Sequence, residues 1–147
     1  MQATISSESI SSAAAQAAVA AAVAKGLEIG CRMNASVVDV GGNLLAFLRA
    51  DGAFLPSIGI SQDKAFTAAG FGMATETLYQ AVKEPQVLCD GIAARPGVVL
   101  FGGGHPIVKD GKVVGGIGCS GGSEEQDSIC ALAGLEAIGL GPTVAGE

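Results

Sequence analysis

The chain has 147 residues, of which 49% are hydrophobic and only 15% are charged, and its net charge is −6. This length predicts a single domain whose core needs no disulfide or metal ion to fold. The eight lysines and arginines are scattered singly, which excludes a basic patch for nucleic acid or for an anionic membrane surface. So little charge leaves apolar surface that must be covered, and we expect the chain to form a homo-oligomer.

Two features of the sequence bear on the compartment. The longest weakly apolar run, from Ser11 to Ala24, is too short to span a bilayer, and it lacks the basic start and leucine-rich centre of a signal peptide. We therefore expect a cytoplasmic protein without a membrane partner. In a reducing compartment, cysteines without paired spacing are expected as small buried side chains rather than disulfides or zinc ligands; the four are Cys31, Cys89, Cys119 and Cys130.

The first half of the chain predicts helices around one β-hairpin. An alanine-rich helix is expected over Thr4–Gly26, with Gly26 as its stop signal. Two β-rich runs around a Gly-Gly-Asn turn predict a hairpin over Ala35–Arg49. Helices are then expected from about Ser61 to Gly70 and over Thr75–Glu84, where the following proline ends the second one.

The second half predicts strands and a final helix. A buried strand is expected over Gly97–Phe101, followed by a hairpin whose turn is Asp110-Gly111. Ser123 and Gln126 have the spacing of a capping box, which predicts a helix from there to about Ile138. The glycine- and proline-containing residues 141–147 are expected to form a flexible tail after a single domain spanning residues 1–140.

Tight turns join strands that run antiparallel. The order of elements therefore predicts an α+β fold with a roughly five-stranded antiparallel sheet and helices packed on it.

Two glycine-rich segments are candidates for ligand binding. Backbone amides at the end of a strand and at the start of a helix favour an anion such as a carboxylate. The alternative is that glycine permits tight turns and close packing, while Glu124 and Glu125 already satisfy the helix dipole. The candidate residues are Gly103, Gly104, Ser120, Gly121 and Gly122.

His105 is the only histidine and lies between a glycine and a proline. This context indicates an exposed, stiff turn, which favours an imidazole placed as a general base or as an axial ligand. The alternative is a surface histidine at the rim of a hairpin. One histidine with scattered cysteines has no zinc-ligand spacing, so no metal site is predicted.

Cys119 ends a strand just before a predicted helix start, a position that lowers the pKa of a thiol. It is a candidate nucleophile with His105 as its base, and a buried structural cysteine is the commoner alternative. Arg49 has the geometry to bind a carboxylate with both nitrogens, and Asp51 and Lys64 are further candidate ligand-binding residues. Their alternative is an Arg49–Asp51 or Lys64–Asp51 ion pair that holds a loop.

Several motifs together resemble the GlcG/HbpS family, also called the haem-degrading domain family, and the similar C-terminal domain of PduO-type proteins. They occur in the right order along nearly the whole chain: Val38–Leu44, Arg49–Ala53, Ser61–Ala69, Gly102–Ile107, Asp110-Gly111, Val114–Gly118, Ser120–Gly122 and Gln126-Asp127.

The resemblance implies a PAS- or profilin-like fold and ring-like homo-oligomers, often octamers. It also implies a small ligand, with haem or a related tetrapyrrole as the best-known one and small organic acids or aromatic compounds in other members. Two departures stand out. The family usually has an aliphatic residue at the position of His105, and the N-terminal helix has none of the histidines with which some members ligate haem.

Two hypotheses for function follow, with a bare oligomeric scaffold as a third. The first is a haem- or tetrapyrrole-binding protein, which would need His105, a cysteine or an oxygen ligand for the iron. The alternative is an enzyme that performs proton transfer, hydrolysis or deamination on a carboxylated metabolite, with His105 as acid/base.

Overall fold

The computed structural model describes residues 1–146. Its elements in chain order are α1 (Ser12–Glu28), β1 (Asn34–Asp39), β2 (Leu44–Arg49), α2 (Pro56–Phe71), α3 (Thr75–Val82), α4 (Gln86–Ala93), β3 (Gly104–Lys109), β4 (Lys112–Ser120) and α5 (Glu124–Ala137). The strands form one antiparallel sheet in the order β2-β1-β4-β3. The predicted α+β class is confirmed, with four strands in place of five.

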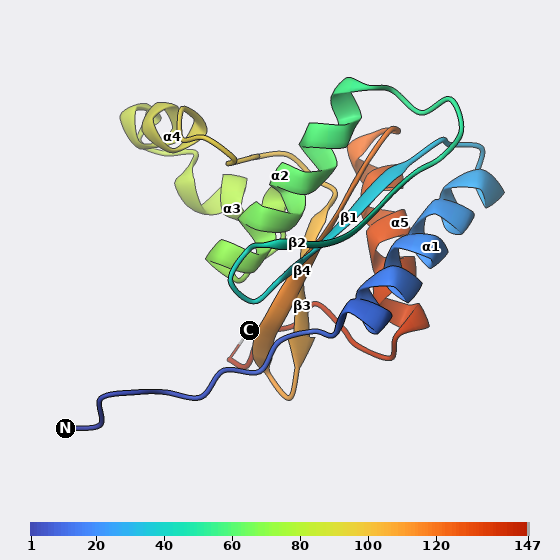
Figure 1. Cartoon of the computed structure of the whole chain (residues 1–147). Coiled ribbons are helices and arrows are strands. Elements are labelled where there is room, and N and C mark those ends of the chain that lie inside the picture. Colours follow the sequence, from blue (N-terminus) through green and yellow to red (C-terminus); the bar gives the residue numbers. More distant parts are fainter. Residues whose placement is uncertain (147) are drawn as a thin grey trace.

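Helices cover both faces of this sheet (Figure 1). Helices α1 and α5 pack on one face, where the main hydrophobic core includes Val19, Val37, Ile107, Ile117 and Leu135. Helix α2 packs on the other face, with α3 and α4 beyond it. The buried hydrophobic cluster on the α2 face is small and consists of Val38, Ala65 and Ala69.

Close backbone contact replaces side-chain packing on the α2 face. Gly116 and Gly118 of β4 point at α2, and a Cβ on them would collide with the carbonyl oxygens of Ala65 and Ser61 respectively. Only glycine lets the helix backbone approach a strand so closely.

The strand expected over Gly97–Phe101 is absent. The loop is held on α2 instead, because the Thr67 hydroxyl donates to Gly97 O at 2.8 Å and accepts from Val99 N at 3.1 Å. The unpredicted helix α4 precedes this loop, and the chain enters β3 only after Gly103, whose φ is +120°.

The first helix is shorter at its start than predicted. It begins at Ser12 rather than Thr4 because the Ser11 side chain accepts the amide of Ala14 and caps the helix there. Gly26 does not end it: this residue is buried inside α1, where a Cβ would lie 2.7 Å from Met33 Cγ.

Both predicted hairpins and the capping box are confirmed. Asp110 and Gly111 take φ values of 52° and 77°, as a two-residue turn between β3 and β4 requires. The amides of Ser123 and Gln126 donate to the Gln126 and Ser123 side chains respectively.

The residues after α5, where a flexible tail is predicted, form two backbone hydrogen bonds with the rest of the chain. Val108 N donates to Gly141 O at 2.8 Å, and Ala145 N donates to Gly111 O at 2.9 Å. Both hydrogen bonds tie the segment to the β3–β4 hairpin. Residue 147 of the predicted tail lies outside the described residues.

None of the helices in residues 1–146 has the length and hydropathy needed to span a bilayer.

Candidate functional site

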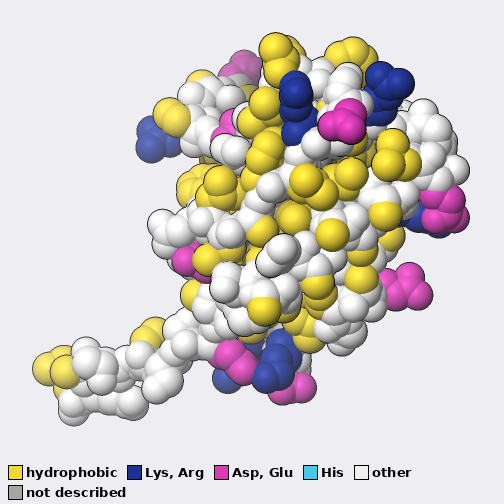
Figure 2. All heavy atoms as spheres, turned by 45° about the vertical axis from the view of Figure 1, so that its right-hand side comes forward, with side chains coloured by type: hydrophobic (Ala, Val, Ile, Leu, Met, Phe, Trp, Pro, Cys, Tyr) yellow, Lys and Arg dark blue, Asp and Glu magenta, His cyan; other side chains and the backbone are white. Residues whose placement is uncertain are grey.

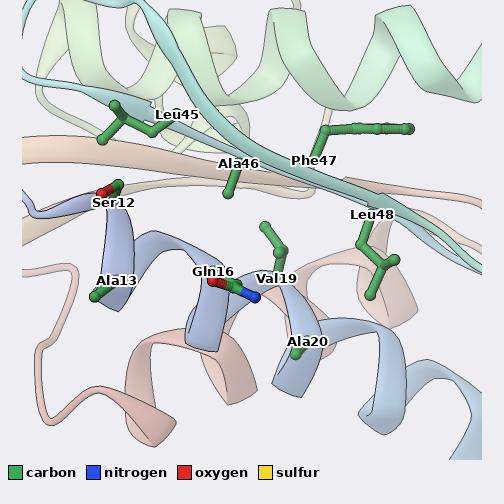
Figure 3. A pocket seen from close by; sticks show the side chains of 9 residues that line it. All are labelled: Ser12, Ala13, Gln16, Val19, Ala20, Leu45, Ala46, Phe47 and Leu48. Atoms are coloured by element: carbon green, nitrogen blue, oxygen red, sulfur yellow. The ribbon is translucent and has the colours of Figure 1, made fainter.

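An open cleft lies between α1 and the edge strand β2, and we call it the α1–β2 cleft (Figure 3). Its volume is about 640 Å3, within the range of small-molecule pockets, which is about 300–1,000 Å3. Val19 points from α1 toward the strand, while Ala46 and Leu48 point from β2 toward the helix. The lining residues are Ser12, Ala13, Gln16, Val19, Ala20, Leu45, Ala46, Phe47 and Leu48.

The walls of this cleft carry no charge. Their polar side chains are Ser12 and Gln16, which lie along α1, and the rest are aliphatic or aromatic. Hydrophobic side chains also spread over the middle of the face shown in Figure 2, with charged ones mostly near its edges. The α1–β2 cleft therefore suits a flat apolar ligand better than a carboxylate.

Lys64 is buried on α2 and is paired with a residue that the sequence did not suggest. Its ammonium group donates to Asp127 Oδ2 at 2.8 Å and to Cys119 O at 2.9 Å, and it lies 5.0 Å from the centre of the Phe101 ring. The alternative of a Lys64–Asp51 ion pair is wrong, because Asp51 lies in an exposed turn after β2, while the buried Lys64 pairs with Asp127 in the first turn of α5.

The glycine-rich segments surround this buried pair. A Cβ at Gly103 would lie 2.6 Å from Lys64 Nζ, and one at Gly104 would lie 2.6 Å from Lys64 O. A Cβ at Gly121 would collide with Arg32 O. Close packing thus accounts for glycine at these positions.

The backbone amides of these segments already have acceptors within the chain. Gly102 N donates to Glu124 Oε1, Gly104 N to Thr75 Oγ1 and Gly122 N to Asp127 Oδ1. Ser120 is buried at the end of β4. A ligand role for Gly103, Gly104, Ser120, Gly121 and Gly122 stays a prediction.

The prediction that His105 lies on an exposed turn is wrong. It lies in β3, pairs with Ile117 and is only 7% exposed. Its Nε2 is 2.7 Å from the Ser128 hydroxyl on α5. Burial lowers the pKa of His105 to about 4, so the imidazole is neutral at neutral pH.

Cys119 and Arg49 also differ from their predicted settings. The Cys119 thiol is fully buried, and this burial raises its pKa well above the ordinary value, so the expected lowering is wrong. Arg49 ends β2 on the exposed rim of the sheet, and it forms no ion pair with Asp51 among residues 1–146.

The fold thus gathers Lys64, Gly103 and Cys119 in the interior and leaves Arg49 and Asp51 on the rim. Sequence reasoning missed Asp127, Ser128 and the residues of the α1–β2 cleft. One signal for the cleft was present: the run from Leu44 to Leu48 is apolar at every position, which an edge strand with one solvated face does not need.

Comparison with known families agrees with this architecture. A family model described as "Haem degrading protein HbpS-like" matches residues 10–136. The chain belongs to the HbpS-like family. The resemblance inferred from the motifs is therefore confirmed.

Relatives of this HbpS-like chain include proteins of known structure. An uncharacterised 15.0 kDa protein of Citrobacter freundii, from a dhaT-dhaS intergenic region, is 41% identical over 129 residues, which cover 86% of this chain and 90% of the relative. The crystal structure of Klebsiella pneumoniae protein ORFY has a TM-score of 0.88 and 36% identity, covering 94% of this chain and 96% of that one. The structure described as a PduOC:haem complex has a TM-score of 0.83 and 31% identity, covering 92% and 99% of the two chains.

Proposed function

We propose that this HbpS-like protein binds haem or a related tetrapyrrole, and that the α1–β2 cleft holds it. The observation that carries the proposal is the match over 92% of the chain to the PduOC domain, whose structure is described as a haem complex. The cleft supports it, because apolar walls and a volume of about 640 Å3 suit a flat macrocycle.

The donor set of the cleft limits how iron is held. Ser12 and Gln16 supply the polar side-chain atoms there, so a side chain of the cleft that bound iron would do so through oxygen. His105 lies on β3, at the opposite edge of the sheet from β2, and its Nε2 is hydrogen-bonded to Ser128. The cleft residues thus fit the macrocycle through apolar contact and supply no imidazole to the iron.

Leu48→Glu is expected to weaken haemin binding about tenfold or more, because it places a carboxylate on an apolar wall of the cleft. The affinity is measured by titration in the Soret band. Iron-free protoporphyrin IX should bind with a similar affinity and show the same loss, since apolar contacts dominate both complexes.

Leu44→Glu is the matched control. It lies on the same strand, is half exposed and does not line the cleft, so it should leave the affinity unchanged. His105→Leu should leave the Soret maximum unshifted. If the wild type and Leu48→Glu bound haemin with equal affinity, or if His105→Leu shifted the Soret maximum, the proposal that haem binds in the α1–β2 cleft would be wrong.

We also propose that the protein is a homo-oligomer. Helix α4 has no buried residue, and its Val87 is 77% exposed. Phe54 and Leu55, before α2, are each about two thirds exposed. Large apolar side chains left in water at several places favour contact between subunits.

Light scattering at micromolar concentration is expected to give a mass that is a multiple of 14.4 kDa. Val87→Lys should lower the mass if α4 lies in the interface, while Leu27→Lys on the exposed end of α1 serves as a comparison. A wild-type mass equal to that of one chain would refute the oligomer.

A further inference from the structure

A serine and a histidine from distant parts of the chain meet at the β3 edge of the sheet. Pairing of His105 with Ile117 turns its ring to the face covered by α5. Ser128 lies in the second turn of α5, whose start is fixed by the Ser123 capping box. The Ser128 Oγ to His105 Nε2 distance is 2.7 Å, within the range for a nucleophile and its base.

The two side chains differ in their access to solvent. His105 is buried, whereas Ser128 is half-buried and lines an open cleft of about 490 Å3. We call this the Ser128 cleft, and its residues are Glu76, Ser123, Glu124, Glu125, Ser128 and Ile129. A substrate in this cleft would meet the serine hydroxyl, with the imidazole behind it.

The His105 imidazole is uncharged at rest, so its Nε2 can accept a proton. With its pKa lowered to about 4 by burial, the ring is uncharged at neutral pH. In the tautomer with the proton on Nδ1, Nε2 accepts a hydrogen bond from the Ser128 hydroxyl.

We propose that Ser128 and His105 form a nucleophile–base pair that hydrolyses small esters carrying a positive charge. This proposal does not depend on tetrapyrrole binding, because the Ser128 cleft and the α1–β2 cleft share no residue.

The reaction has two balanced steps. Ser128 Oγ attacks the carbonyl carbon while its proton passes to His105 Nε2; the ester C–O bond then breaks, and the alcohol leaves with that proton. Water attacks the acyl-serine in the same way, releases the acid and restores the Ser128 hydroxyl.

The charge of the cleft selects the substrate. Glu124 accepts a hydrogen bond from Gly102 N at 2.6 Å, and Glu76 and Glu125 are exposed. Several negatively charged carboxylates around a cleft raise the local concentration of a cation and repel an anion. These charges favour a cationic ester over the carboxylated metabolite of the alternative hypothesis drawn from the sequence.

Covalent labelling tests the nucleophile. A fluorophosphonate probe should modify the folded wild-type protein at Ser128, as located by peptide mass spectrometry, and should leave Ser128→Ala unlabelled. His105→Gln keeps a hydrogen-bonding side chain but no base, so it should slow labelling by about 100-fold or more. Circular dichroism establishes that each variant is folded. Labelling of Ser128 no faster than of the exposed Ser6, or undiminished in folded His105→Gln, would overturn the proposal.

Turnover tests the substrate class with a pair of esters of similar shape. Acetylcholine should be hydrolysed with a higher kcat/KM than the neutral 3,3-dimethylbutyl acetate, and added salt should reduce the difference. Glu125→Gln should reduce the preference, while Glu136→Gln at the far end of α5 should not. No hydrolysis above that of Ser128→Ala, or equal rates for the two esters, would overturn this assignment.

Discussion

Replacing Asp127 by alanine is expected to lower the free energy of unfolding by about 3–5 kcal/mol, because it leaves the Lys64 ammonium group buried without its counter-charge. The side chains of Lys64 and Asp127 are 1% and 5% exposed, so water cannot replace the lost partner. Gly122 N would lose its acceptor as well. Urea unfolding monitored by circular dichroism measures the change.

The pair between Lys109 and Glu8 provides the control. Its N–O distance is 2.6 Å, but both side chains are about half exposed. Glu8→Ala is therefore expected to leave the free energy of unfolding almost unchanged. The double variant Lys64→Met with Asp127→Leu should recover part of the loss, since no buried charge remains. A loss in Asp127→Ala no larger than in Glu8→Ala would contradict the assigned role of the pair.

Gly118→Ala is expected to destabilise the fold by about 3 kcal/mol, at the upper end of the usual cost of overpacking. Its added methyl group would meet the Ser61 carbonyl oxygen and lie 2.6 Å from Ala65 N, both of which are backbone atoms of α2. Backbone cannot rotate out of the way as a side chain does. Helix α2 must move away from the sheet, and unfolding in urea should shift to lower concentration.

Gly59→Ala is the matched control, because Gly59 lies in α2 with no atom within 4 Å of an added Cβ. Alanine is favoured over glycine within a helix by about 0.5–1 kcal/mol, so this variant should be slightly stabilised. If Gly118→Ala unfolds at the wild-type urea concentration, α2 does not depend on this close approach.

Local signals in the sequence predicted the features that depend on neighbouring residues. The Asp110-Gly111 turn and the Ser123–Gln126 capping box each involve a few consecutive residues, and both are present. Helix α4 was missed because it is only eight residues long and contains Gly91, a residue with low helix propensity.

The setting of His105 depended on residues far along the chain. Its glycine and proline neighbours indicated a turn, yet Pro106 is accommodated in β3 because this is an edge strand that can lack one amide hydrogen. Burial of the ring comes from α5, more than 20 residues away. The partner of Lys64 is 63 residues away, and no spacing rule connects such a pair.

The two faces of the sheet are held by different kinds of contact, and this has a consequence for how the domain fluctuates. The α1 and α5 face is held by a broad cluster of buried hydrophobic side chains, whereas the cluster on the α2 face has three residues, and that face depends more on backbone fit and hydrogen bonds. Segments with few buried apolar contacts open at the lower free energies. The α2 layer, with α3 and α4, is therefore the part that separates first in transient openings, while the sheet and the α1–α5 layer stay together. Such an opening would expose Lys64 and Asp127 to water before the domain as a whole unfolds.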